Sequence, residues 1–259
     1  MDLGIAGRKA IVCASSRGLG KACAIALAEA GCEVVVNGRD PKILEVTVEE
    51  LRTRTGALVL GVLGDVGDDS VRKTLLEACP EPDILVNNNG GPPFKEFAKL
   101  TREDIQSGLD ANMITPILLA QGVLPGMAAR GFGRIVNITS FSVRAPIPGL
   151  DVSSGARAGL TALLAAAARA HAKANVTINS IQPGVFDTDR TRPGLERRAA
   201  ELGGDMAKAR AERESVIPAR RLGRPEEFGK LCAFLCSAHA GYVTGQNILI
   251  DGGVFPGAF

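Results

Sequence analysis

The sequence has few of the residues that hold metals or stack against nucleic-acid bases. It contains no tryptophan, one tyrosine and two histidines among 259 residues. Its six cysteines include no CxxC pair, so a zinc site is not expected, and Cys232 and Cys236 are spaced to share one buried helix face. The net charge is only +2, and no basic tract is interleaved with aromatic residues. We therefore expect a small-molecule substrate and no nucleic-acid partner.

Long hydrophobic runs are also missing. No apolar run approaches the roughly 18 to 20 residues of a membrane span, and the first residues lack the charged head and long apolar region of a signal peptide. These absences predict a cytoplasmic protein without a membrane partner. The chain is long enough, and at 46% apolar enough, to bury the core of one domain.

What the sequence does contain is a regular alternation of short apolar strands with helical segments. The strand-like stretches are KAIVCAS, CEVVVNG, ALVLGVLGD, DILVNNN, GRIVNITS, NVTINSIQPG and QNILIDGG. Continuous apolar strands joined by helices predict parallel strands buried on both faces. We therefore expect an α/β fold, a single Rossmann-type domain over 1–259 with a doubly wound parallel sheet and helices on both faces. Thr101 in TRED predicts a helix start with a capping box, and an arginine-rich helical segment at about 189–221 is expected to form a substrate lid.

A glycine-containing turn, CASSRGLG, links the first predicted strand to the first helix. Glycine lets the backbone approach a phosphate closely, and a helix N-terminus offers free N–H groups and the positive end of its dipole. This position predicts a dinucleotide site, against the alternative of a tight turn required only for helix packing. The expected contacts come from Ser15, Ser16, Arg17, Gly18, Leu19 and Gly20.

The end of the second strand, VVVNGRD, indicates which dinucleotide binds. An acidic residue there would hold a ribose 2′-hydroxyl, but Asn37 and Arg39 occupy the place, with Arg17 nearby in the first turn. Guanidinium groups grip a 2′-phosphate through charge-assisted hydrogen bonds. We therefore predict NADP(H), the alternative being two solvated surface arginines.

These motifs together resemble the short-chain dehydrogenase/reductase family over essentially the whole chain, and in particular its 3-oxoacyl-acyl-carrier-protein reductases. GDVGD, NNNG, LDANMI, GRIVNITS, QPGVFDT and VTGQ…DGG match family motifs, although Ala14 replaces a glycine and Asn89 an alanine. The resemblance implies further cofactor contacts from Asp65, Val66, Asn88, Asn89, Gly90, Pro183, Gly184, Val185 and Thr188. It also implies that Asn112 anchors a proton-relay water and that Ser140 belongs to the reaction site.

The tyrosine and lysine that the family uses for proton transfer are absent from their expected places. Thirteen residues after Ser140 stands Ser153, and four further on stands Arg157, while the only tyrosine is Tyr242. The resemblance implies that the lysine lowers the tyrosine pKa and holds the nicotinamide ribose. Serine is a far weaker acid than tyrosine, and arginine stays protonated at working pH, so neither replaces the phenol as a proton donor.

Three interpretations of this exchange stay open at the level of sequence. Arg157, Ser140 and Ser153 could form an oxyanion site while a water on Asn112 supplies the proton. The acceptor could instead need no strong acid, as for an iminium, a quinone or a conjugated system. The chain could also bind NADP(H) without reacting, as a regulatory or structural subunit. Independently of these, Ser153 and Ser154 could cap their helix, with Arg157 paired to Asp151 or solvent.

The substrate side and the assembly have weaker signals. The lid has a modest cationic excess, which favours an anionic substrate or an acyl thioester, and Arg144 is a second candidate for an anionic group. Phe94, Phe97 and Phe141 are expected to wall the pocket. The alanine-rich helix over 153–173 is apolar on more than one face, and the resemblance implies that it packs against a copy in a homotetramer.

Overall fold

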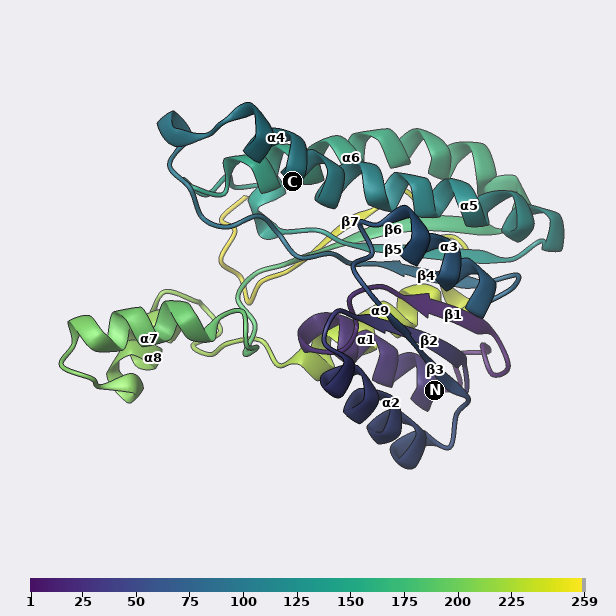
Figure 1. Cartoon of the computed structure of the whole chain (residues 1–259), viewed down its shortest axis with the longest axis horizontal. Helices are drawn as coiled ribbons and strands as arrows, with labels where there is room; N and C mark the ends of the chain where they lie inside the picture. The colour runs from purple at the N-terminus through teal and green to yellow at the C-terminus, as the bar shows by residue number, and fades with distance from the viewer. Residues whose placement is uncertain (258–259) are drawn as a thin grey trace.

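A seven-stranded parallel sheet in the order β3-β2-β1-β4-β5-β6-β7 forms the centre of the molecule (Figure 1). The computed structural model describes residues 1–257. Its strands are β1 (Lys9–Val12), β2 (Glu33–Gly38), β3 (Val59–Leu63), β4 (Ile84–Asn87), β5 (Gly133–Ile138), β6 (Val176–Pro183) and β7 (Asn247–Ile250). The predicted doubly wound α/β fold is confirmed. The chain reverses direction across the sheet between β1 and β4, and open α/β sheets bind ligands beyond the carboxyl ends of the strands at such a switch point.

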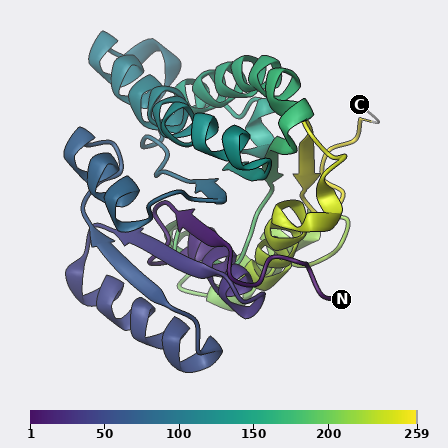
Figure 2. The ribbon, with the colours of Figure 1, turned by 90° about the vertical axis from the view of Figure 1, so that its right-hand side faces the viewer.

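Helices cover both faces of the sheet (Figures 1 and 2). One face carries α1 (Gly18–Glu29), α2 (Pro41–Thr55) and α9 (Pro225–Cys236). The other carries α3 (Asp69–Ala78), α4 (Arg102–Leu109), α5 (Thr115–Arg130) and α6 (Asp151–His171). Each helical layer packs its own apolar core against one face of the sheet. The central strands β4 and β5 are therefore buried along their whole length. Cys232 and Cys236 lie in the first of these cores, fully buried on α9 as predicted.

Two short helices, α7 (Arg192–Glu201) and α8 (Met206–Ser215), project from the body of the domain (Figure 1). They occupy the segment from which the lid was expected. Arg198 joins them, because its guanidinium lies 2.7 Å from Glu201 on α7 and 2.7 Å from Glu212 on α8. Arg210 ties the pair to the body through Asp187 at 2.8 Å. Most of their side chains are exposed, so their attachment to the body depends largely on polar contacts.

One long helical run connects α4 to α5 through a π turn over Asp110–Ile114. It begins with the predicted capping box, in which Thr101 and Asp104 each bond the other's backbone N–H. Among residues 1–257, Arg102–Arg130 is the one helix long and apolar enough to cross a membrane, and 44% of its most apolar window is buried. The sequence expectation missed this run because polar residues such as Asn112 and Gln121 interrupt it. A core helix of a water-soluble protein can be equally long and apolar, so length and composition alone are weak evidence for a membrane span.

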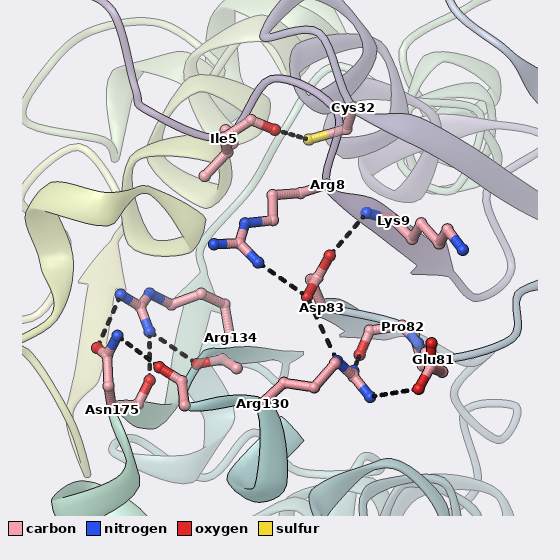
Figure 3. A network of polar contacts seen from close by, with 12 residues as sticks. Ile5, Arg8, Lys9, Cys32, Glu81, Pro82, Asp83, Arg130, Arg134 and Asn175 are labelled. Carbon is pink, nitrogen blue, oxygen red and sulfur yellow. Dashed lines mark hydrogen bonds and ion pairs between the residues drawn. The ribbon is translucent and has the colours of Figure 1, made fainter. Parts of the chain in front are cut away.

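The edge of the sheet where the strands begin is closed by a polar network (Figure 3). Asp83 accepts hydrogen bonds from Arg8 Nη1 at 3.2 Å and from the Lys9 backbone N–H at 3.2 Å. Two guanidinium groups stack on the Phe132 ring, with Arg8 Cζ 4.0 Å and Arg134 Cζ 4.3 Å from the ring centroid. Arg134 is buried and donates to backbone carbonyls. This edge is therefore held by its own side chains, and the opposite edge carries the open site.

Candidate functional site

A cleft of about 1630 Å³ opens at the carboxyl ends of the strands. Its walls come from the segments that follow all seven strands, from the start of α6, and from α7 and α8. Most residues predicted from the sequence line this one cleft: Ser16, Arg17, Gly18, Leu19, Asn37, Arg39, Asp65, Val66, Asn88, Asn89, Gly90, Ser140, Ser153, Arg157, Pro183, Gly184, Val185 and Thr188. Ser15, Gly20 and Asn112 do not line the cleft themselves but contact residues that do.

The turn after β1 needs its glycines for two different reasons. Gly18 adopts φ +57°, a left-handed conformation that glycine adopts without strain. At Gly20 a side chain would meet the Ala14 carbonyl oxygen at 2.5 Å and the Asn88 amide at 2.8 Å. The first turn of α1 contains no acidic residue, and the N-cap Arg17 makes no side-chain cap. The N–H groups at this helix start therefore remain available for an anion.

Ser15 and Asn37 shape the turn from inside the protein. The Ser15 hydroxyl donates to the Val12 carbonyl at 2.6 Å and accepts from the Asn37 backbone N–H at 3.0 Å. The Asn37 side chain accepts from the Ala14 N–H and donates to the Val62 and Gly64 carbonyls. Both side chains are fully occupied, so they position the loops after β1, β2 and β3 around the cleft.

The nucleotide end of the cleft carries two exposed arginines. Arg39 lies 3.3 Å from Asp65, and Arg17 lies 3.7 Å from Asp40. Asp40 also accepts from two backbone N–H groups at the start of α2 and serves as its N-cap. The Arg39 side chain is 77% exposed, which leaves its guanidinium free to turn toward a ligand.

At the other end of the cleft, a chain of hydrogen bonds joins three buried side chains. Arg157 Nε donates to Ser153 Oγ at 3.1 Å, and Ser153 Oγ donates to Asn112 Oδ1 at 3.2 Å. Asn112 Nδ2 donates in turn to the Gly90 carbonyl at 3.0 Å. The π turn places Asn112 against α6, and one helical turn separates positions 153 and 157. Asn112 therefore acts on the cleft through the Ser153 hydroxyl.

The sequence alternative in which these serines cap α6 is wrong. The helix begins at Asp151, and its N-cap residue Leu150 makes no side-chain cap. Ser154 Oγ instead donates back to the Leu150 carbonyl. Arg157 is 8% exposed and makes no ion pair with Asp151 or any other acid among residues 1–257. Because α6 already begins at Asp151, Ser153 and Arg157 both lie within the helix, and both line the cleft.

Arg157 is held as a buried cation. Its Nη1 donates to the Ile138 carbonyl at 2.6 Å, and its Nη2 reaches the Asn89 carbonyl at 3.4 Å. Burial, and after it the charge of Arg190, lower the pKa of the Arg157 guanidinium to about 10. The group is therefore charged at neutral pH but lacks a compensating anion.

Several side chains lie differently from their expected places. Arg144 does not line the cleft, because its guanidinium bonds Gln182 Oε1 and the Asn247 carbonyl and lies over the Phe255 ring. Phe97 is exposed away from the cleft, whereas Phe94 and Phe141 line it. Arg190 and Gly91 also line the cleft, although neither was among the site residues predicted from the motifs. Gly91 directly follows NNNG, which is the one sequence signal that could have pointed to it.

The fold and this cleft together define a dinucleotide-dependent enzyme class, and comparisons with known proteins agree. A family model described as enoyl-(acyl carrier protein) reductase matches residues 13–255. The 3-oxoacyl-(acyl-carrier-protein) reductase FabG of Aquifex aeolicus (strain VF5) is 32% identical over 98% of this chain and 100% of that protein. Dehydrogenase/reductase SDR family member 4 of Homo sapiens is 33% identical over 96% of this chain and 88% of that protein.

A solved structure shares the whole fold. L-sorbose reductase from Gluconobacter frateurii, complexed with NADPH and L-sorbose, superposes with a TM-score of 0.94 at 29% identity and covers 99% of this chain and 100% of that one. The chain belongs to the short-chain dehydrogenase/reductase family. It is thus a member of a family of NAD(P)-dependent oxidoreductases.

Proposed function

We propose that this protein is an NADP(H)-dependent reductase or dehydrogenase for a small carbonyl compound or another activated acceptor. Its reaction site is atypical, with Ser153 and Arg157 in place of the family's tyrosine and lysine. The observation that carries the proposal is that the Arg157–Ser153–Asn112 chain and the glycine turn of Gly18 open into the same cleft. A bound dinucleotide that reaches from the turn to Ser153 would bring hydride chemistry to this chain.

The residues at the nucleotide end fit NADP(H). The free N–H groups at the start of α1 suit the pyrophosphate, and Gly20 gives the turn its close contact with Ala14 and Asn88. Arg17 and Arg39 would hold the adenosine 2′-phosphate, and each reaches it by leaving an exposed aspartate partner. Exposed ion pairs of this kind contribute little stability, so exchanging them for a phosphate costs little. Pro183, Gly184, Val185 and Thr188 would line the nicotinamide half.

At the reaction end, the reduced nicotinamide supplies the hydride, and this chain supplies an oxyanion site. The Ser153 hydroxyl turns from Asn112 Oδ1 to the substrate oxygen as negative charge develops there. Arg157 Nε continues to donate to Ser153 Oγ, which strengthens the hydroxyl as a donor. Ser140 Oγ, which accepts from Ser142, has its own proton free to donate to the same oxygen. The alcohol then takes its proton from water, because no lining side chain of residues 1–257 is a tyrosine, histidine or cysteine.

This mechanism predicts an enzyme that is slow on ordinary ketones. A positioned general acid contributes about 10²- to 10⁴-fold in rate, and this cleft stabilises the oxyanion without one. The test is consumption of NADPH, and in parallel of NADH, over a panel of carbonyl, imine and quinone acceptors. We expect turnover of activated acceptors with NADPH preferred, and at least a 100-fold loss in the Arg157→Ala variant.

The double variant Ser153→Tyr with Arg157→Lys is the matched comparison. It restores a phenolic acid, so we expect a gain of ordinary ketone reduction with the rest of the cleft unchanged. Tight NADPH binding without turnover of any acceptor would contradict the reductase and favour a cofactor-binding subunit. Unchanged turnover in Arg157→Ala would contradict the oxyanion role.

A further inference from the structure

Two cationic side chains approach one small space in the cleft. Gly91 marks this space, because a Cβ added to it would lie 2.9 Å from Arg190 Nη2 and 3.6 Å from Ser153 Oγ. Arg157 Nε donates to the same Ser153 oxygen at 3.1 Å. Arg190 comes from the loop before α7 and Arg157 from α6, so the lid and the body meet here.

Neither arginine has an acidic partner among residues 1–257. The acidic residues that line the cleft pair with other arginines: Asp40 with Arg17, Asp65 with Arg39, Asp189 with Arg192, and Glu212 with Arg198. Arg157 bonds only neutral oxygens and is 8% exposed. Arg157 is buried and Arg190 is exposed, so their like charges meet at the boundary between protein and solvent. The two guanidinium groups repel each other, and a bound anion would remove that repulsion.

We infer that Arg190 and Arg157 form a carboxylate-binding subsite and that the substrate is a small oxo acid. The inference rests on the proposed reductase function and names its substrate class. A guanidinium is a planar fork that matches a carboxylate, which favours this anion over a point-like one. Because Arg190 Nη2 and Ser153 Oγ border the same space beside Gly91, the carboxylate is placed on the carbon next to the reacting carbonyl or one carbon further away.

The absence of a side chain at Gly91 keeps the space open. Its φ is not in the left-handed region, so alanine suits the backbone there. A methyl group at this position would displace the end of the flexible Arg190 side chain at little cost to folding. Gly91→Ala therefore closes the subsite without removing either charge.

Binding of oxamate tests the subsite without relying on turnover. Oxamate carries one carboxylate beside an unreactive carbonyl, and oxamide is its neutral counterpart. Calorimetric titration into the protein with NADPH is expected to detect oxamate but not oxamide. We expect oxamate affinity to fall roughly 10- to 100-fold in Arg190→Gln and in Gly91→Ala. Arg192→Gln is the matched control, since Arg192 lies outside the cleft and pairs with Asp189 at 3.4 Å.

Each outcome separates the subsite from the reductase. Equal affinity for oxamate and oxamide, or oxamate binding that survives Arg190→Gln, overturns the carboxylate subsite. If Arg190→Gln weakens NADPH binding and leaves oxamate unaffected, Arg190 serves a cofactor phosphate and the inference is also wrong. Oxamate binding that depends on Arg190 supports the subsite, but if NADPH is then consumed with other acceptors and with no oxo acid, the oxo-acid substrate is wrong. No NADPH consumption with any acceptor contradicts the proposed function and leaves the subsite standing.

Discussion

Arg157 determines the expected pH dependence at the scale of single residues. Burial and the charge of Arg190 lower its pKa to about 10, so its charge is present below that pH and is lost above it. No tyrosine, histidine or cysteine among residues 1–257 lines the cleft to titrate at lower pH. We therefore expect kcat/KM to stay level from about pH 6 to 9 and to fall as Arg157 deprotonates near pH 10.

The pH at which activity falls, and not the direction of the fall, distinguishes Arg157 from a general acid of lower pKa, because both groups must be protonated to act. A bound carboxylate favours the charged guanidinium, so the fall in kcat should lie at higher pH than the fall in kcat/KM. Rate profiles measured between pH 6 and 11, with Arg157→Lys as the control, provide the comparison. A loss of kcat/KM centred near pH 7 or 8 would show that another group carries the proton.

At the scale of elements, we propose that helices α7 and α8 form the lid of the cleft. They project from the domain and are linked by exposed ion pairs of Arg198 and Arg210 (Figure 1). Thr188, Arg190 and Arg213 from this region line the cleft. We expect bound NADPH to cover them and to slow trypsin cleavage in the lid about five-fold or more.

Mass spectrometry of the first cleavage products measures this protection site by site. Cleavage after Lys73 on α3, which is exposed and outside the cleft, is the internal control and should be unaffected by NADPH. Equal slowing at both sites would indicate general stabilisation of the fold. If NADPH does not change the rate of trypsin cleavage in α7 and α8, these helices do not cover the cleft.

The strands and loops also show how far sequence reasoning reaches. Apolar runs such as GRIVNITS predict a buried parallel strand, because contacts with the core determine the position of such a strand. Ser140, two residues after the end of this strand, then reaches the carboxyl edge of the sheet. The same reasoning failed for Arg144, which was expected to bind an anionic group in the cleft. Arg144 lies beyond the end of the strand, and its side chain turns toward Gln182 instead. Arg190 could not be placed either, since no periodic pattern fixes the path of the loop before α7. The sequence predicted Ser153 at the position where the resemblance places the tyrosine, but the contact of Ser153 with Asn112 depends on the π turn and could not be predicted.

For the whole molecule, the exposed apolar side chains on α4, the π turn, α5 and α6 need an explanation. Ile105, Ile114, Leu118 and Leu163 are each 39% to 46% exposed. They lie on helices that cover one face of the sheet (Figure 1), and three of them belong to the Arg102–Arg130 run that is apolar enough to span a membrane. A second copy of the chain packed on this layer would bury them. Packing against a copy would explain why the Arg102–Arg130 run is apolar without requiring a membrane. It also supports the homotetramer as a proposal.

The double variant Leu118→Glu with Leu163→Arg tests this assembly. Charges on both helices make burial against a copy unfavourable. We therefore expect sedimentation velocity to show species smaller than the tetramer proposed for the wild type, and thermal unfolding to begin at a lower temperature. Val46→Glu on α2 is the matched control, because Val46 is 64% exposed on the other face of the sheet and should leave the assembly intact. A wild-type protein that sediments as a monomer at micromolar concentration contradicts the tetramer.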